Sequence, residues 1–128
     1  MDPRAEDYRK RVLRRGQATP EDVDAIDEIL EAEGPTVDLL LLRGQMIQLI
    51  SDAGPEDLEQ ALASFEEALE LDPSRPEPYE EIAHFMDDLA DDPEEAEAFF
   101  RKAIELGAGE SAREGLRDVL AQLGRYDG

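Results

Sequence analysis

Apolar residues recur along this chain at the three- and four-residue spacing of an α-helix, and Gly and Pro fall between the periodic segments. No stretch shows the strict alternation that is typical of a half-buried β-strand. Ala, Leu and Glu, which favour helices, dominate the periodic segments. We therefore expect an all-α fold of about seven helices, which cover residues 3–15, 20–33, 36–51, 55–71, 76–90, 93–106 and 110–123.

Several of these helices begin with a recognisable capping signal. Thr19 is followed by Pro20 and then by acids, the pattern of an N-cap, a Pro in the first helical position and a negatively charged first turn. Asp92 precedes Pro93 in the same way, and Thr36 stands at the start of the helix expected over 36–51. These three side chains predict where their helices start.

The chain also repeats itself. The segment "ALASFEEALELDP" starts at residue 61, and "AEAFFRKAIELGA" starts 35 residues later. Self-similarity at this period predicts stacked helical repeats, because one helix pair cannot bury its apolar face alone. The aligned pairs are Ala61 and Ala96, Phe65 and Phe100, Ala68 and Ala103, Leu69 and Ile104, and Leu71 and Leu106.

This repeat resembles the tetratricopeptide repeat, a helix–turn–helix unit of about 34 residues whose second helix carries Ala, an aromatic residue and Ala at this spacing. The resemblance implies a right-handed superhelical stack of antiparallel helix pairs. It implies a single domain, residues 1–128, with a degenerate pair at 4–33, repeats at 36–73 and 76–108, and a capping helix at 110–123. The family's Trp is missing, and Arg43 stands where the family usually has Leu. An irregular antiparallel helical bundle is the alternative.

The charge of the chain narrows the choice of partners. It has 34 acidic and 13 basic residues and a formal net charge of −21, which disfavours nucleic acid and anionic membranes. Residues 1–16 carry six basic and three acidic side chains, whereas the other 112 residues carry 7 basic and 31 acidic ones. No apolar run approaches a membrane span, and the first residues lack the apolar core of a secretory signal. We expect a cytoplasmic protein, with no membrane or nucleic-acid partner.

Catalytic and metal-binding patterns are not apparent in the sequence. The chain has no Cys, which excludes disulfides, thiolate metal ligands and a Cys nucleophile, and His84 is its only His. It has no Gly-rich phosphate-binding loop. The acidic run "DDLADDPEE" lacks the alternating acids and central Gly of an EF-hand loop. We expect no enzyme activity, no cofactor and no metal.

The family resemblance implies a scaffold that holds a peptide or helix in a concave groove lined by the first helix of each repeat. An acidic groove favours a basic or amphipathic segment, and the cationic clamp of chaperone-binding members is not found here. The alternative is a solvated acidic face. The groove positions carried over are Asp38, Leu41, Gln45 and Gln48, then Glu77, Glu80, His84 and Asp87, and finally Glu114 and Asp118.

The basic segment "YRKRVLRR", residues 8–15, has three possible roles. It could pack on its own repeat, with Val12 and Leu13 as core residues. It could dock on a second copy and form a homodimer, or it could contact an external anionic partner.

Two functions follow for the whole chain: an adaptor or chaperone-like interaction module, or an acidic charge mimic that sequesters a basic protein. The sequence leaves open whether the chain is a whole protein or part of a longer repeat array.

Overall fold

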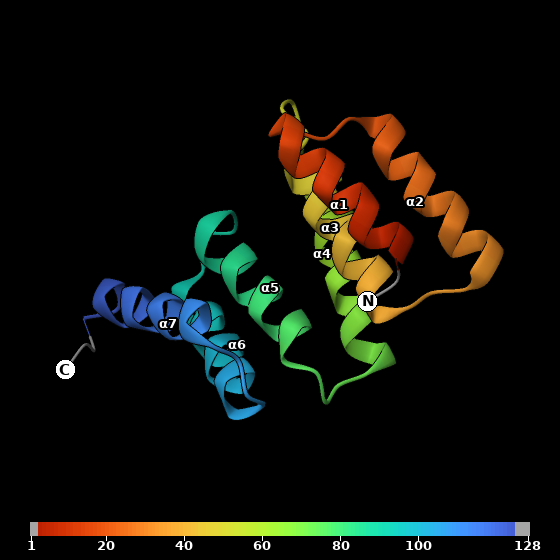
Figure 1. Ribbon diagram of the computed structural model, residues 1–128. Helices are drawn as coiled ribbons and strands as arrows, with labels where there is room; N and C mark the ends of the chain where they lie inside the picture. The colour runs from red at the N-terminus through yellow and green to blue at the C-terminus, as the bar shows by residue number, and fades with distance from the viewer. Residues whose placement is uncertain (1–2, 125–128) are drawn as a thin grey trace. The chain divides into compact units, whose positions relative to one another are not determined.

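The computed structural model describes residues 3–124, and within this range the chain forms seven α-helices and no β-strand (Figure 1). The all-α prediction is confirmed. All seven predicted helices form, and every boundary but one agrees within two residues. The helices are α1 (Pro3–Arg15), α2 (Pro20–Glu33), α3 (Val37–Gln48), α4 (Pro55–Leu71), α5 (Pro76–Asp88), α6 (Pro93–Glu105) and α7 (Glu110–Gln122).

The end of α3 is the boundary at which the sequence-based prediction is wrong. α3 ends at Gln48 and not at Ser51. The carbonyl of Leu49 accepts a hydrogen bond from the N–H of Ala18 at 3.0 Å, and Ala18 and Ile50 form an isolated parallel β-bridge. The loop between α1 and α2 therefore terminates α3, and no local pattern in the sequence signals such a contact.

The predicted caps are confirmed by their hydrogen bonds. The Thr19 hydroxyl accepts from the Asp22 N–H at 3.3 Å, and the Asp22 carboxylate accepts from the Thr19 N–H at 2.9 Å, which completes a capping box. The Thr36 hydroxyl accepts from the Leu39 N–H at 3.2 Å, and Asp92 caps α6 in the same manner. Each such cap stabilises its helix by about 0.5–2 kcal/mol.

The Asp22 carboxylate also ties the end of α1 to the start of α2. Burial by itself raises the pKa of Asp22, but hydrogen bonds from the Thr19 N–H, the Arg15 guanidinium and the Thr19 hydroxyl outweigh burial. The pKa of Asp22 is therefore held below its ordinary value. The hydrogen bonds from Thr19 and Arg15 thus favour the ionised form of the Asp22 carboxylate.

The chain divides into two compact units. The first unit, Met1–Leu71, contains α1 to α4, and the second unit, Asp72–Gly128, contains α5 to α7. The boundary falls between the two repeats that the sequence predicts. Each unit has its own hydrophobic core and is described by itself. The number of domains and the right-handed superhelical arrangement stay predictions.

α3 is the central helix of the first unit and packs against α1, α2 and α4 (Figure 1). Its sequence is apolar around most of its circumference, as expected for a helix with neighbours on several sides. Leu39 and Met46 of α3 are each 1% exposed. Val12 from α1, Ile26 from α2 and Ala61 from α4 belong to the same core.

Arg43, which departs from the family's usual Leu, joins three helices of the first unit through polar contacts. Its Nε donates to Asp27 Oδ1 of α2 at 2.6 Å, and its Nη1 donates to Ser64 Oγ of α4 at 2.7 Å. Its Nη2 donates to Gln60 Oε1 at 3.3 Å, and Ser64 Oγ donates to the Gln60 carbonyl at 3.0 Å. Ser64 is buried, so this network satisfies a polar group that would otherwise destabilise the core.

The positions that the repeat alignment equates are equally buried in the two units. The small residue, the ring and the second small residue of the motif are all 0% exposed in both copies. The predicted correspondence between α4 and α6 is therefore confirmed at its core positions. These are Ala61, Phe65 and Ala68 on α4 and Ala96, Phe100 and Ala103 on α6.

Each of the two rings packs directly against a helical glycine. A Cβ added to Gly44 of α3 would lie 2.4 Å from the ring of Phe65, and one added to Gly115 of α7 would lie 2.3 Å from the ring of Phe100. Real Cβ atoms do not come so close to carbon. The rings therefore occupy the space that a side chain would need, and the paired helices approach closely in both units.

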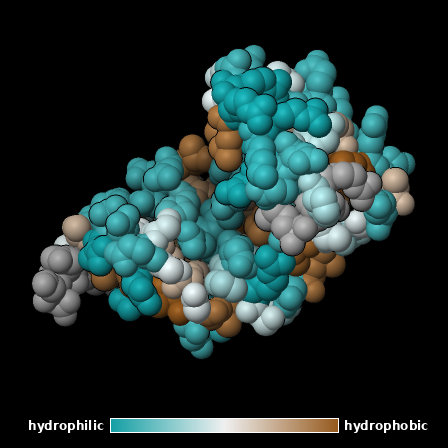
Figure 2. All heavy atoms as spheres, viewed as in Figure 1, coloured by the Kyte–Doolittle hydropathy of each residue, from teal (hydrophilic) through white to brown (hydrophobic). Residues whose placement is uncertain are grey.

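Hydrophilic residues cover most of the face seen in Figure 2, and hydrophobic residues form small separate patches. The exposed large hydrophobic side chains include Leu13 and Leu49 of the first unit. Within residues 3–124, no helix is long and apolar enough to cross a membrane.

Candidate functional site

The groove residues predicted on α5 and α7 lie on two helices that pack together in the second unit. Those of α5 are spaced by three or four residues and therefore share one side of the helix. Those of α7 are four residues apart, with the same consequence. The residues are Glu77, Glu80, His84 and Asp87 on α5, and Glu114 and Asp118 on α7.

Two side-chain contacts join these faces of α5 and α7. The Gln122 Nε2 donates to Asp87 Oδ1 at 2.8 Å, and the Ser111 hydroxyl lies 3.4 Å from His84 Nε2. The predicted acids of α7 lie between these two contact points along the helix. The structure therefore brings predicted residues of α5 against the α7 face that carries the others.

His84 is held by its neighbours on three helices. Its ring meets the Phe100 ring edge to face, with centroids 4.9 Å apart, and its Nε2 lies 3.5 Å from Glu80 Oε2 and near Ser111. In a Ser–His–acid relay, the hydroxyl and the acid contact opposite ring nitrogens. Here both approach Nε2, so the geometry does not activate Ser111 as a nucleophile. Among the described residues, no group of three or more His, Asp or Glu is placed to hold a metal ion.

We name as the acidic face the five carboxylates among these residues: Glu77, Glu80, Asp87, Glu114 and Asp118. Glu77, Glu114 and Asp118 are exposed, whereas Glu80 and Asp87 are half-buried. Glu77 Oε1 accepts from Arg75 Nε at 3.0 Å, a pair that is open to solvent. Several carboxylates on adjoining helices create a local negative potential that attracts cationic side chains.

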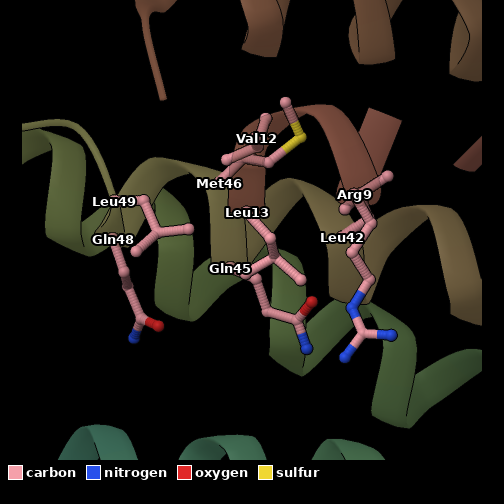
Figure 3. A pocket seen from close by; sticks show the side chains of 8 residues that line it. All are labelled: Arg9, Val12, Leu13, Leu42, Gln45, Met46, Gln48 and Leu49. Atoms are coloured by element: carbon pink, nitrogen blue, oxygen red, sulfur yellow. The ribbon is translucent and has the colours of Figure 1, made fainter. Parts of the chain in front are cut away.

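The other four predicted groove residues lie on α3 in the first unit, where Asp38 is half-buried. Gln45 and Gln48 line a cleft of about 260 Å³ between α1 and α3 (Figure 3). Leu41, also assigned to the groove, is 7% exposed and offers little surface to a ligand. The cleft, named below the α1–α3 cleft, is lined by Arg9, Val12, Leu13, Leu42, Gln45, Met46, Gln48 and Leu49.

The basic helix α1 packs on α3 of its own chain. Of the adjacent apolar residues Val12 and Leu13, it buries only Val12. Val12 is 1% exposed and belongs to the core, whereas Leu13 is 59% exposed. The expectation that both are core residues is therefore wrong for Leu13. Successive helical residues point about 100° apart, and the packing that buries Val12 leaves Leu13 exposed.

Comparison with known families supports the resemblance directly. A family model of the tetratricopeptide repeat matches residues 56–75, which lie in α4 and the turn after it. The resemblance is confirmed for this segment, and the seven-helix architecture is consistent with a helical repeat. No curated protein matches the chain significantly.

Tetratricopeptide repeats are generally non-catalytic and bind protein partners on the surfaces of their stacked helices. The match therefore indicates a protein–protein interaction module.

Proposed function

We propose that this chain is an adaptor or chaperone-like scaffold, which holds a basic or amphipathic segment of a partner protein on the acidic face of α5 and α7. The observation that supports the proposal is that five carboxylates lie on α5 and α7, two helices that pack together and are joined by the Asp87–Gln122 hydrogen bond. The family's usual mode of action, peptide or helix binding on first helices of repeats, agrees with it.

Affinity on this face must come from several contacts acting together. One exposed ion pair contributes about 0–1 kcal/mol, so carboxylates alone give weak and salt-sensitive binding. An amphipathic ligand adds apolar burial at about 25 cal/mol per Å². We therefore expect a partner segment that combines Lys or Arg with apolar anchors, and binding that weakens with salt without being abolished.

The test is capture of partners from native cells with three forms of the protein at low and moderate salt. One variant replaces Glu77, Glu114 and Asp118, all exposed on the acidic face, by Lys. The control makes the same change in charge elsewhere, at residues 59, 66 and 70, which are exposed glutamates on α4. A partner that the intact chain and the control retain, and the acidic-face variant loses, supports the proposal.

A charge mimic that sequesters a basic protein is the second candidate, because residues 17–128 carry 31 acidic side chains against 7 basic ones. A mimic uses its whole surface potential and has no discrete hot spots. Both triple variants then weaken binding equally, and moderate salt releases the partner from all three forms. This result would reject the groove-binding proposal.

The setting we propose is the cytoplasm, and the lack of Cys is compatible with a reducing compartment. A homodimer in which the basic α1 of one copy contacts the acidic face of another also stays a proposal. Sedimentation equilibrium of the intact chain and the acidic-face variant tests it, since only the intact chain should then associate.

A further inference from the structure

The α1–α3 cleft has one formal charge among its lining residues, the positive charge of Arg9. The chain is strongly acidic, yet none of the acidic residues within 3–124 lines this cleft. Three other surface hollows, around Arg43 and around Asp22, each include at least one carboxylate. The polar groups of the cleft are the Arg9 guanidinium and the amides of Gln45 and Gln48. A negatively charged ligand therefore meets less repulsion here than at the two hollows around Arg43. The hollow around Asp22 is more basic, since three arginines line it, but no apolar residue lines it.

The cleft also has the apolar surface that a docking site requires. Val12 and Met46 form its buried floor, and Leu13 and Leu49 flank it at 59% and 37% exposure. Figure 3 shows Leu13 and Leu49 projecting to the same side as the guanidinium of Arg9. Neighbouring exposed apolar side chains with a polar rim are typical of interaction surfaces.

We propose that the α1–α3 cleft binds an acidic amphipathic helix of a partner protein. Its volume of about 260 Å³ lies below the ~300–1,000 Å³ of small-molecule pockets, so it fits side-chain anchors better than a whole small ligand. Apolar residues at i, i+3 or i+4, and i+7 of a helix can enter such a groove. Carboxylates beside these anchors then reach Arg9 and the glutamine amides.

The existing contacts of Arg9 do not prevent this. Arg9 Nη1 lies 3.9 Å from Glu6 Oε2, and the side chain of Arg9 is 47% exposed. Such an exposed pair is weak, so a carboxylate of the ligand can replace it or add to it.

A second copy of the chain fits the cleft less well than an acidic partner. A two-fold dimer through this surface would bring the same patch of both copies together. The basic residues of α1, among them Arg9, Lys10 and Arg14, would then face like charges. Partner selection here is also independent of the acidic face, which favours ligands of the opposite charge.

The test is an NMR titration of the intact chain with two short helical peptides, observed at its methionine methyl groups. Both peptides carry Leu at i, i+4 and i+7, and they differ only in having Glu or Lys at the remaining charged positions. Met46 reports binding in the cleft, and Met86 on α5, next to Asp87, reports binding at the acidic face. We expect the Glu peptide to shift Met46 saturably without shifting Met86, and the Lys peptide to leave Met46 unchanged.

Three variants complete the experiment. Leu13→Gln should lower the affinity for the Glu peptide about tenfold or more, as expected for the loss of an interface hot spot. Leu89→Gln, at a residue 46% exposed in the second unit, should leave its affinity unchanged. Arg9→Glu should remove the preference for the Glu peptide. Circular dichroism checks that all three variants fold.

The other outcomes each overturn the proposal. Equal binding of both peptides indicates an apolar surface that does not select charge, and binding of neither shows that the cleft is not a helix site. Met46 shifts that grow with protein concentration in the absence of peptide, and that Leu13→Gln removes, assign the cleft to a second copy of the chain.

Discussion

The contact between Gly115 and Phe100 allows the packing of the second unit to be tested with a single methyl group. Replacing a glycine inside a helix by alanine ordinarily stabilises a protein by about 0.5–1 kcal/mol. At Gly115, however, the new Cβ would lie 2.3 Å from Cζ and 2.4 Å from Cε1 of the fully buried Phe100. Either the ring must leave its position or α7 must move away.

Forcing an extra methyl group into a packed core costs about 1–3 kcal/mol. Two ring atoms within 2.5 Å place Gly115→Ala in the upper part of this range, because no flexible chain end is available to yield. After subtraction of the gain in helix propensity, we expect a net loss of about 1–2 kcal/mol. The sign is the informative quantity, since it is opposite to the usual effect of Gly→Ala in a helix.

The assay is urea unfolding of four proteins: the original chain, Gly115→Ala, Phe100→Leu and the double variant. Leucine lacks the outer ring atoms that the new Cβ would meet, so Gly115→Ala should be neutral or stabilising in the Phe100→Leu background. The double-mutant cycle formed by these four proteins should therefore show a coupling free energy of about 1–3 kcal/mol between residues 100 and 115. The reasoning fails if Gly115→Ala stabilises the original chain, or if it costs the same in both backgrounds.

Three further predictions concern the first unit. Gly44→Ala should destabilise the chain by about 1–2 kcal/mol, because its Cβ would lie 2.4 Å from the Phe65 ring; an increase in the urea midpoint would contradict this. Ser64→Ala should cost about 1–3 kcal/mol in the same assay, since it removes a buried acceptor from Arg43, and an unchanged midpoint would show that solvent replaces the hydroxyl. Asp22→Asn should destabilise the chain at neutral pH, because the pKa of Asp22 is lowered in the folded state. The ionised carboxylate contributes stability above the pKa that Asp22 has in the unfolded chain, and this contribution is lost as the pH falls through its pKa in the folded chain. The difference between Asp22→Asn and the original chain should therefore shrink below about pH 4, and a constant difference across a pH series would refute the role of its charge.

The sequence predicts the helices and their starts well because the determining interactions are local. Thr19 and Thr36 cap helices through hydrogen bonds to residues three positions away, and such spacing is legible in a single chain. The end of α3 was misplaced for the opposite reason. It depends on the Ala18 N–H, about 30 residues earlier, which finds the Leu49 carbonyl only after the first unit has folded.

The candidate sites, too, are predictable where local spacing determines them and not where they depend on how the helices pack. Helical spacing alone places Glu77 and Asp87 on one side of α5, but the hydrogen bond from Gln122 to Asp87 depends on how α7 packs. The departure at Arg43 is visible in the sequence, yet its partners come from helices whose register the sequence does not reveal. One of the three roles that the sequence allows for the basic segment counts both Val12 and Leu13 as core residues, and only the packing of α1 on α3 separates the two.

The central claim is that this chain is an interaction module whose acidic face receives a partner. The most direct measurement is hydrogen exchange by mass spectrometry on the chain alone and with the partner captured from native cells. The account predicts that the partner slows exchange only in α5 and α7. Replacing Glu77, Glu114 and Asp118 by Lys should remove this protection. Slower exchange elsewhere, or an equal response to the control substitutions on α4, would contradict the claim.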